Sequence, residues 1–159
     1  MIKKIKNNIL VTICAKGNSR GLKGKNIKKF HNKPLIYYAI KKAFDNNFNY
    51  ICLSTESKKI QKIGVKYKLK SFFLRSKKLS GSNVAKEEVW KDAIIKSENF
   101  YKKKFKYILD IEVTNPMLNS RDLSKFISFF FRKKNYLKLN GLFYISPARK
   151  NPYFNILKK

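Results

Sequence analysis

Acidic side chains are scarce in this chain: 9 Asp and Glu stand against 38 Lys and Arg among 159 residues, for a formal net charge of +29. Such a charge is compatible with nucleic-acid binding. Arginine, however, is rare, and the lysines are spread over nearly every segment instead of forming one arm or patch. Asparagine and isoleucine are abundant, as in proteins encoded by AT-rich DNA. We therefore interpret the charge mainly as compositional bias and keep nucleic-acid binding as an alternative.

Cysteine and histidine are also rare. Cys14 and Cys52 lie in separate apolar runs without C-x-x-C spacing, and His31 is the only histidine. These residues are too few for a metal site built from cysteine and histidine. The two thiols are predicted to be buried and reduced, which is typical of cytoplasmic proteins. His31 is predicted to be an exposed turn residue.

Long apolar runs are absent as well. No stretch approaches the ~20 apolar residues of a membrane-spanning helix, so no membrane partner is expected. The basic N-terminal residues and the short apolar run after them superficially resemble a signal peptide. That run is at the lower limit of length and leads directly into a glycine-rich loop. We predict that it is the first β-strand of a cytoplasmic protein.

Short apolar runs alternate along the chain with segments of helical periodicity. Strands are predicted at residues 9–15, 50–54, 71–74, 107–113 and 141–146, and helices at residues 34–44, 57–67, 86–97 and 123–130. This alternation predicts an α/β fold, a Rossmann-like open and mainly parallel sheet with helices on both faces. At this length we expect a single domain over residues 1–159. Ligands of such folds bind at the carboxyl ends of the strands.

A glycine-rich, basic loop follows the first predicted strand. Residues 15–26 read AKGNSRGLKGKN, in which the cations are Lys16, Arg20, Lys23 and Lys25. Backbone amides and cations in such a loop suit a polyphosphate. The loop is not a P-loop, because Asn26 follows Lys25, and its glycine spacing differs from the dinucleotide-binding fingerprint. A tight surface turn with solvated lysines is the alternative interpretation.

Two acidic residues, Asp110 and Glu112, lie two positions apart in the predicted strand of residues 107–113. Alternate residues of a strand face the same side. A carboxylate pair at a strand end can bind Mg²⁺ or act as a base; an ordinary pairing with lysine is the open alternative. Arg75, after the third predicted strand, is expected at the same edge of the sheet. Trp90 lies on an apolar helical stripe and is predicted to belong to the core.

Several segments resemble one family. Residues 15–26 resemble the A-R-G-G-S-K-x-x-x-G-K-N signature of the acylneuraminate (CMP-sialic acid type) cytidylyltransferases. Further similar segments follow in the same order: NKPLIYYAIKKA at 32–43, FLRSKKLSGSNVAKEEVW at 73–90 and DIEVTNPMLNSRDL at 110–123. The tail SPARKNPYFNIL at 146–157 is most similar to members acting on legionaminic-acid-like sugars. The resemblance implies a fold of the nucleotide-diphospho-sugar transferase type.

The resemblance also implies a reaction. CTP and a nonulosonic (sialic or legionaminic type) acid are the expected partners, and Mg²⁺ is the expected cofactor. The anomeric hydroxyl of the sugar attacks the α-phosphate of CTP, giving a CMP-sugar and pyrophosphate. Such a transfer needs charge neutralisation and in-line positioning more than a covalent nucleophile.

The site residues implied by the resemblance are assigned position by position. Lys16 and Lys25 are expected to be catalytic, and Asp110 and Glu112 to bind the metal. Lys16 stands where the family has an arginine, so the charge is kept but the bidentate fork is lost. The expected nucleotide-binding residues are Ala15, Lys16, Gly17, Asn18, Ser19, Arg20, Lys25, Asn26 and Arg75.

The chain also departs from the family pattern. Leu118 stands in place of an arginine and Ser82 in place of an aspartate. Family members continue past the point matching Lys159 with an acidic metal-binding motif and part of the sugar pocket. We therefore expect a domain that is incomplete at its C-terminus relative to the family. The alternative is an inactive nucleotide-binding relic or subunit. Whether active or not, the protein is expected to act as a homo-oligomer or with a complementing subunit.

Overall fold

The computed structural model describes residues 5–19 and 21–144. The chain divides into two compact units, Met1–Ser124 and Lys125–Lys159, and each is described by itself. All strands found in the described residues lie in the first unit. The expectation of one domain over residues 1–159 stays a prediction.

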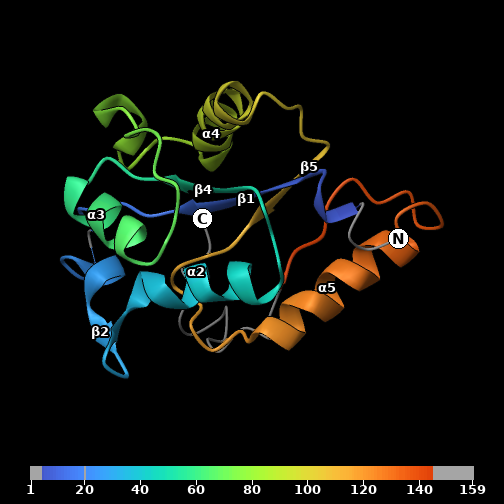
Figure 1. The fold of residues 1–159 in the computed structure, drawn as a ribbon, viewed down its shortest axis with the longest axis horizontal. Coiled ribbons are helices and arrows are strands. Elements are labelled where there is room, and N and C mark those ends of the chain that lie inside the picture. The colour runs from blue at the N-terminus through green and yellow to red at the C-terminus, as the bar shows by residue number, and fades with distance from the viewer. Residues whose placement is uncertain (1–4, 20, 145–159) are drawn as a thin grey trace, which may run out of the picture. The chain divides into compact units, whose positions relative to one another are not determined.

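A three-stranded parallel sheet lies at the centre of the first unit (Figure 1). β1 (Ile9–Cys14) lies between β4 (Ile51–Ser54) and β5 (Tyr107–Asp110), so the strand order is β4-β1-β5. Thr12 of β1 is aligned with Asp110, the last residue of β5. Because the strands run in one direction, their carboxyl ends meet at one edge of the sheet. This edge is where a ligand site is expected.

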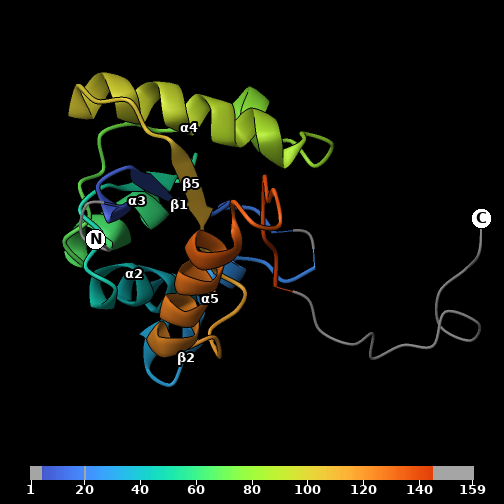
Figure 2. The ribbon, with the colours of Figure 1, turned by 90° about the vertical axis from the view of Figure 1, so that its right-hand side faces the viewer.

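Helices cover both faces of this sheet. α2 (Leu35–Asp45) packs against β1, and α4 (Lys86–Tyr101) contacts β1 and β4. Figure 2 shows α2 and α4 on opposite sides of the strands. α3 (Lys58–Lys66) begins after Ser57, whose hydroxyl accepts a 3.3 Å hydrogen bond from the amide of Ile60. The predicted α/β class, with helices on both faces of a parallel sheet, is confirmed.

The core of the first unit forms between the sheet and these helices. β1 is buried from its first residue to its fifth, as expected for a central strand covered on both faces. Neither Cys14 nor Cys52 forms a disulfide. Cys52 is buried, and burial raises the pKa of its thiol to about 12. The largest fully buried apolar side chains are Leu10, Val11, Ile13, Ile36, Ile40, Leu53 and Ile60.

A short antiparallel hairpin precedes α2. It consists of β2 (Lys29–Phe30) and β3 (Lys33–Pro34). The two turn residues, His31 and Asn32, have φ angles of 44° and 63°. Positive φ at both positions is typical of a two-residue hairpin turn. His31 is exposed, so its prediction as a turn residue is confirmed.

Three strand predictions need correction. Residues 71–74 form no strand, although Phe72 and Phe73 pack against the core. The next residue, Arg75, donates a 2.8 Å hydrogen bond from its backbone amide to the carbonyl of Thr55. β5 ends at Asp110 and not at residue 113. Residues 141–144 form no strand, and residues 145–146 lie outside the described part of the chain. In the first case apolar side chains indicated burial, which does not require a hydrogen-bonded ladder.

α5 (Ser120–Lys133) runs across the boundary between the two units. Within the second unit, the rings of Phe126 and Tyr144 stack with their centroids 4.2 Å apart.

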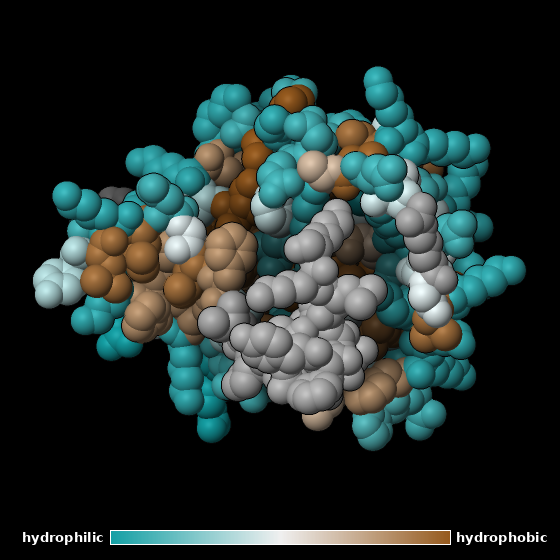
Figure 3. All heavy atoms as spheres, turned by 180° about the vertical axis from the view of Figure 1, so that it is seen from behind, coloured by the Kyte–Doolittle hydropathy of each residue, from teal (hydrophilic) through white to brown (hydrophobic). Residues whose placement is uncertain are grey.

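Among the described residues, no helix combines the length and apolar character needed to cross a membrane. Hydrophilic side chains are spread over the face drawn in Figure 3 and do not gather into one stripe.

Candidate functional site

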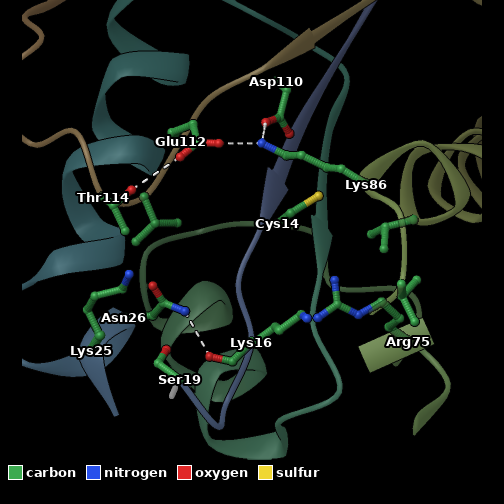
Figure 4. A pocket seen from close by; sticks show the side chains of 13 residues that line it. Cys14, Lys16, Ser19, Lys25, Asn26, Arg75, Lys86, Asp110, Glu112 and Thr114 are labelled. Carbon is green, nitrogen blue, oxygen red and sulfur yellow. Dashed lines mark hydrogen bonds and ion pairs between the residues drawn. The ribbon is translucent and has the colours of Figure 1, made fainter. Parts of the chain in front are cut away.

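A cavity of about 360 Å³ opens in the first unit at the carboxyl ends of β1 and β5. Its volume lies in the range of small-molecule sites. Four segments line it. The first two are the end of β1 with the loop after it, and Arg75, which lies shortly before η2 (Lys77–Ser80). The other two are the start of α4 with the residues before it, and the chain at the end of β5. The lining residues, shown in Figure 4, are Cys14, Lys16, Ser19, Lys25, Asn26, Arg75, Val84, Lys86, Val89, Asp110, Glu112, Val113 and Thr114.

The loop after β1 is fixed by hydrogen bonds within itself. Asn26 lies in the 3₁₀ turn η1 (Lys25–Ile27) and is only 6% exposed. Its side-chain amide donates a 2.8 Å hydrogen bond to the carbonyl of Lys16. The turn follows Gly24, whose φ of 66° is a left-handed conformation that favours glycine. Asn26 therefore ties the backbone of Lys16 to the turn that carries Lys25.

Glu56 connects this loop to Arg75. One carboxylate oxygen of Glu56 accepts a 2.6 Å hydrogen bond from the amide of Gly17, and the other pairs with the Arg75 guanidinium at 2.9 Å. Burial opposes the charge on Glu56, but hydrogen bonds from its own backbone amide, from Gly17 and from Arg75 outweigh it and lower the pKa of the carboxyl. Arg75 is only 3% exposed and also donates to the hydroxyl of Ser80 at 3.0 Å. The glycine loop and Arg75 thus share one partly buried anion.

Gly17 is required by this close approach. A Cβ atom at this position would lie 2.8 Å from the Cβ of Ser57, the residue that caps α3. On its other side, the Lys16 ammonium donates a 2.5 Å hydrogen bond to the carbonyl of Gly81, in the segment before α4. The loop is therefore packed against the segment after β4 and is also tied to the segment before α4.

The carboxylates lie at the far wall of the cavity. The hydroxyl of Thr12 donates a 2.7 Å hydrogen bond to Asp110, and the hydroxyl of Thr114 donates a 3.2 Å hydrogen bond to Glu112. The ammonium of Lys86 contacts both acids, at 2.7 Å from an oxygen of Asp110 and in a direct ion pair with Glu112. Glu112 lies two residues beyond the end of β5, so strand alternation does not apply to it. What the two acids share is their contact with Lys86.

The charges of these groups depend on one another. Burial opposes the charge on Lys86, but hydrogen bonds to Asp110 and Glu112 outweigh it and raise the pKa of Lys86. The hydrogen bond from Lys86 lowers the pKa of Glu112, and the charge of Lys25 acts in the same direction. Burial, reinforced by the charge of Asp110, raises the pKa of the Cys14 thiol. A protonated thiol is a poor nucleophile, so the cavity's chemistry rests on its cations and carboxylates.

Most of the residues predicted for the site meet at this cavity. Of the nucleotide-binding set, Lys16, Ser19, Lys25, Asn26 and Arg75 line it. Buried Ala15 and half-buried Gly17 lie in the same loop but outside the lining, and Asn18 is exposed. Arg20 lies outside the described residues.

Three further residues of the site were not foreseen from the sequence: Glu56, Lys86 and Thr114. Glu56 could have been found, because it is an acid placed two residues after a predicted strand in a chain with few acids. No local pattern marks Lys86, whose partners Asp110 and Glu112 lie far from it in the chain. Thr114 is part of a segment that was recognised, but its contact with Glu112 depends on the turn after β5.

The carboxylate pair fits a divalent cation in one respect that the structure shows. A single positive group, the Lys86 ammonium, contacts both Asp110 and Glu112, so one cation can be shared by the two acids. Within residues 5–19 and 21–144, no cluster of three or more histidine, cysteine or acidic side chains is placed to hold a metal. Mg²⁺ commonly uses one or two carboxylates and completes its shell with substrate phosphates. The pair therefore suits a metal that arrives with a polyphosphate.

Comparison with known proteins identifies the family. A family model described as cytidylyltransferase matches residues 10–152. The chain belongs to the cytidylyltransferase family. The cytidylyltransferase match covers every lining segment of the cavity, and the family resemblance seen in the sequence is confirmed.

Relatives of this chain include two proteins from Campylobacter. Post-translational flagellin modification protein B of Campylobacter coli is 37% identical over 153 residues, which are 96% of this chain and 63% of that protein. CMP-N,N'-diacetyllegionaminic acid synthase of Campylobacter jejuni is 36% identical over 151 residues, which are 94% of this chain and 63% of that protein. The chain thus spans about 63% of the length of these relatives.

Solved structures share the fold. The structure of CMP:2-keto-3-deoxy-manno-octonic acid synthetase in complex with CTP matches with a TM-score of 0.61 and 15% identity, over 79% of this chain and 48% of that one. A cytidylyltransferase from Leptospira borgpetersenii matches with a TM-score of 0.60 and 17% identity, over 80% of this chain and 50% of that one. The predicted Rossmann-like fold is confirmed.

Proposed function

We propose that this chain forms the nucleotide-binding part of an enzyme that transfers CMP from CTP to the anomeric hydroxyl of a nonulosonic acid. The observation that carries the proposal is the cavity at the end of β1, where Lys16, Lys25 and Arg75 face Asp110 and Glu112. Cations on a glycine-containing loop suit a triphosphate. Two carboxylates opposite them suit the metal that accompanies it.

Each group has a place in the proposed reaction. The sugar oxygen forms a bond to the α-phosphorus, the bond from that phosphorus to the β-phosphate oxygen breaks, and the hydroxyl proton leaves to a base or to water. Lys16 and Lys25 neutralise the charge that develops on the leaving pyrophosphate. The buried amide of Asn26 holds Lys16 in place through its carbonyl, and the Ser19 hydroxyl lies at the cavity wall.

The expected cofactor is Mg²⁺. Asp110 and Glu112 would hold it together with phosphate oxygens, and it would supply Lewis-acid polarisation of the phosphate that is attacked. The two threonine hydroxyls that donate to these carboxylates keep one oxygen of each acid oriented.

The proposed sugar is of the legionaminic type. The legionaminic acid synthase of Campylobacter jejuni is 36% identical to this chain, whereas pseudaminic acid cytidylyltransferase of the same organism is 28% identical. The sequence of the tail, which lies outside the described residues, favours the same assignment. The two free thiols are in keeping with the expected cytoplasmic location.

Thermal unfolding with nucleotides tests the binding step. At 100 times its dissociation constant, CTP with Mg²⁺ is expected to stabilise the fold by about 2.7 kcal/mol, whereas GTP should not. The substitution Lys25→Met should weaken CTP binding about tenfold, because it removes a charged contact to phosphate. Lys23→Met is the matched control: it removes the same charge from the same loop at an exposed position outside the cavity lining. Equal loss in both variants would contradict the assignment of Lys25.

Pyrophosphate release separates an enzyme from a binding module. With CTP and a panel of nonulosonic acids, release that depends on the sugar supports the transferase. Stabilisation by CTP without release from any sugar would instead favour a nucleotide-binding relic or a subunit that needs a partner. Size measurement with and without CTP addresses the predicted oligomer. Duplex DNA binding that competes with CTP would favour the nucleic-acid alternative.

A further inference from the structure

Lys86 has an unusual position among the lysines of the first unit. It is the first residue of α4, and its ammonium contacts two acids at the end of β5. The close-up in Figure 4 shows its side chain extending from α4 to a point between Asp110 and Glu112. The contact joins segments that are 24 and 26 positions apart in the chain. Lys86 therefore occupies the place where the two carboxylates can share one cation.

The surroundings show that this is a built contact. The side chain of Asp110 is 13% exposed and is fixed on its other oxygen by Thr12. The Lys86 ammonium also lies 5.5 Å from the ring centroid of half-buried Trp90, one turn further along α4. By contrast, Lys91 on the same helix forms its ion pair with Glu88 three positions before it, and both side chains are more than half exposed.

We propose that Lys86 is the resident counter-ion of Asp110 and Glu112, and that it competes with a divalent cation for this carboxylate pair. An ammonium and a metal ion cannot both contact the same oxygens, because two positive charges a few ångströms apart repel strongly in a partly buried site. The pair therefore takes up metal readily only when Lys86 moves away. The phosphates of a nucleotide are the acceptor to which Lys86 moves, and this second step rests on the proposed function.

The competition can be measured without nucleotide. Mn²⁺ binding, followed by its electron paramagnetic resonance signal, is compared for the unmodified chain, Lys86→Met and the control Lys91→Met. Both substitutions remove one positive charge from α4, so the effect of net charge cancels. Lys86→Met is expected to bind Mn²⁺ about tenfold more tightly than the control, a difference of about 1.4 kcal/mol. Adding Asp110→Asn to Lys86→Met should abolish the gain.

Two outcomes overturn the proposal. Equal Mn²⁺ affinity of the Lys86 and Lys91 variants would show that Lys86 does not compete with metal. A gain that survives Asp110→Asn would place the bound metal elsewhere. Lys86→Gln is measured in parallel as a second substitution of different polarity, and circular dichroism verifies that each variant retains its helices.

The nucleotide step has its own readout. In EDTA, Lys86→Met should weaken metal-free CTP binding several-fold relative to Lys91→Met, because the ammonium that reaches the phosphates has been removed. An unmodified chain that binds CTP neither in EDTA nor with Mg²⁺ would refute the proposed function, while the Mn²⁺ comparison would still stand. Unchanged metal-free CTP affinity in Lys86→Met, beside an Mn²⁺ gain, would overturn the transfer of Lys86 to phosphate.

Discussion

The two walls of the cavity are held in different ways. On the loop wall, buried Arg75 and the amide of Gly17 are joined by Glu56, and Asn26 bonds the loop backbone. On the carboxylate wall, Lys86 is 40% exposed and is the cation that the two acids share. One wall is therefore preorganised by the fold, while the other is closed by a contact that a ligand can replace. Variants on each wall test this difference.

The largest effect is expected from Glu56→Gln on the loop wall. This substitution leaves the buried Arg75 without a negative partner, and removing one member of a buried ion pair costs about 3 kcal/mol. Urea unfolding provides the measurement. Glu88→Gln removes an acid from an exposed pair on α4 and should change the unfolding free energy by less than about 0.5 kcal/mol. Similar values for the two variants would mean that Arg75 does not depend on Glu56.

A pH effect of similar size is expected from Lys42, which supports the chain beyond the carboxylates. Its buried ammonium donates a 2.5 Å hydrogen bond to the carbonyl of Asn115, and burial lowers its pKa from 10.5 to about 8. Between these values the unfolded chain holds a proton that the native state has released. Stability from this group therefore rises with pH across the window, by about 3 kcal/mol in total at 1.36 kcal/mol per pH unit.

The Lys42 contribution is isolated by comparing the unmodified chain with Lys42→Met between about pH 8 and pH 10.5, the window set by this pKa shift. Other lysines and the thiols titrate in both proteins, so their effects cancel in the difference. The unmodified chain should gain stability relative to the variant as the pH rises. Parallel curves would contradict a buried, deprotonating Lys42.

A smaller effect is expected from Gly17→Ala. The new Cβ would lie 2.8 Å from the Cβ of Ser57, and such overpacking costs about 1–3 kcal/mol. Gly21→Ala is the matched control in the same loop, because among the described residues, its chain neighbours aside, no heavy atom lies within 4 Å of a Cβ added there. Thermal unfolding should separate the two variants by several degrees. A neutral Gly17→Ala, or a Gly21→Ala that loses more stability, would contradict the close packing of Gly17 against Ser57.

The smallest effect is expected from Lys86→Met on the carboxylate wall. Partly exposed ion pairs contribute about 0–1 kcal/mol, and a lysine at a helix start is unfavourable to the helix dipole. The loss of stability should therefore stay below about 1 kcal/mol in urea unfolding. A loss as large as that of Glu56→Gln would erase the difference between the two walls.

The sequence predicted the framework of the fold well where local chemistry decides it. The predicted ends of β1, β4 and α3 agree with the structure to within about one residue. Continuous apolar runs marked the two strands, and the capping hydroxyl of Ser57 marked the start of α3. The segment 71–74 was predicted wrongly, because aromatic side chains that pack on a core look the same in sequence as those of a paired strand. β5 was predicted too long for a related reason: Ile111 and Val113, just after its end, are buried without belonging to the strand.

Only those residues of the site that belong to recognisable motifs were predicted from the sequence. Lys16, Lys25, Asn26 and Arg75 were named from family motifs, and the fold brings them to one cavity. Their catalytic and binding roles stay predictions. The position of Glu56 after a predicted strand could have marked it as a site residue. The partners of Glu56 and Lys86 depend on which side chains face each other after folding, which spacing does not reveal.

The few acids of the chain have a consequence for ionic strength. Three of the 9 acidic residues, Glu56, Asp110 and Glu112, lie at or directly behind this cavity, where they face the cations Lys16, Lys25, Arg75 and Lys86. The cavity is thus nearly neutral inside a chain of net charge +29. Added salt screens the exposed lysines first and weakens their non-specific hold on polyanions. Binding inside the cavity, where cations and acids lie close together, should respond to salt far less than the net charge suggests.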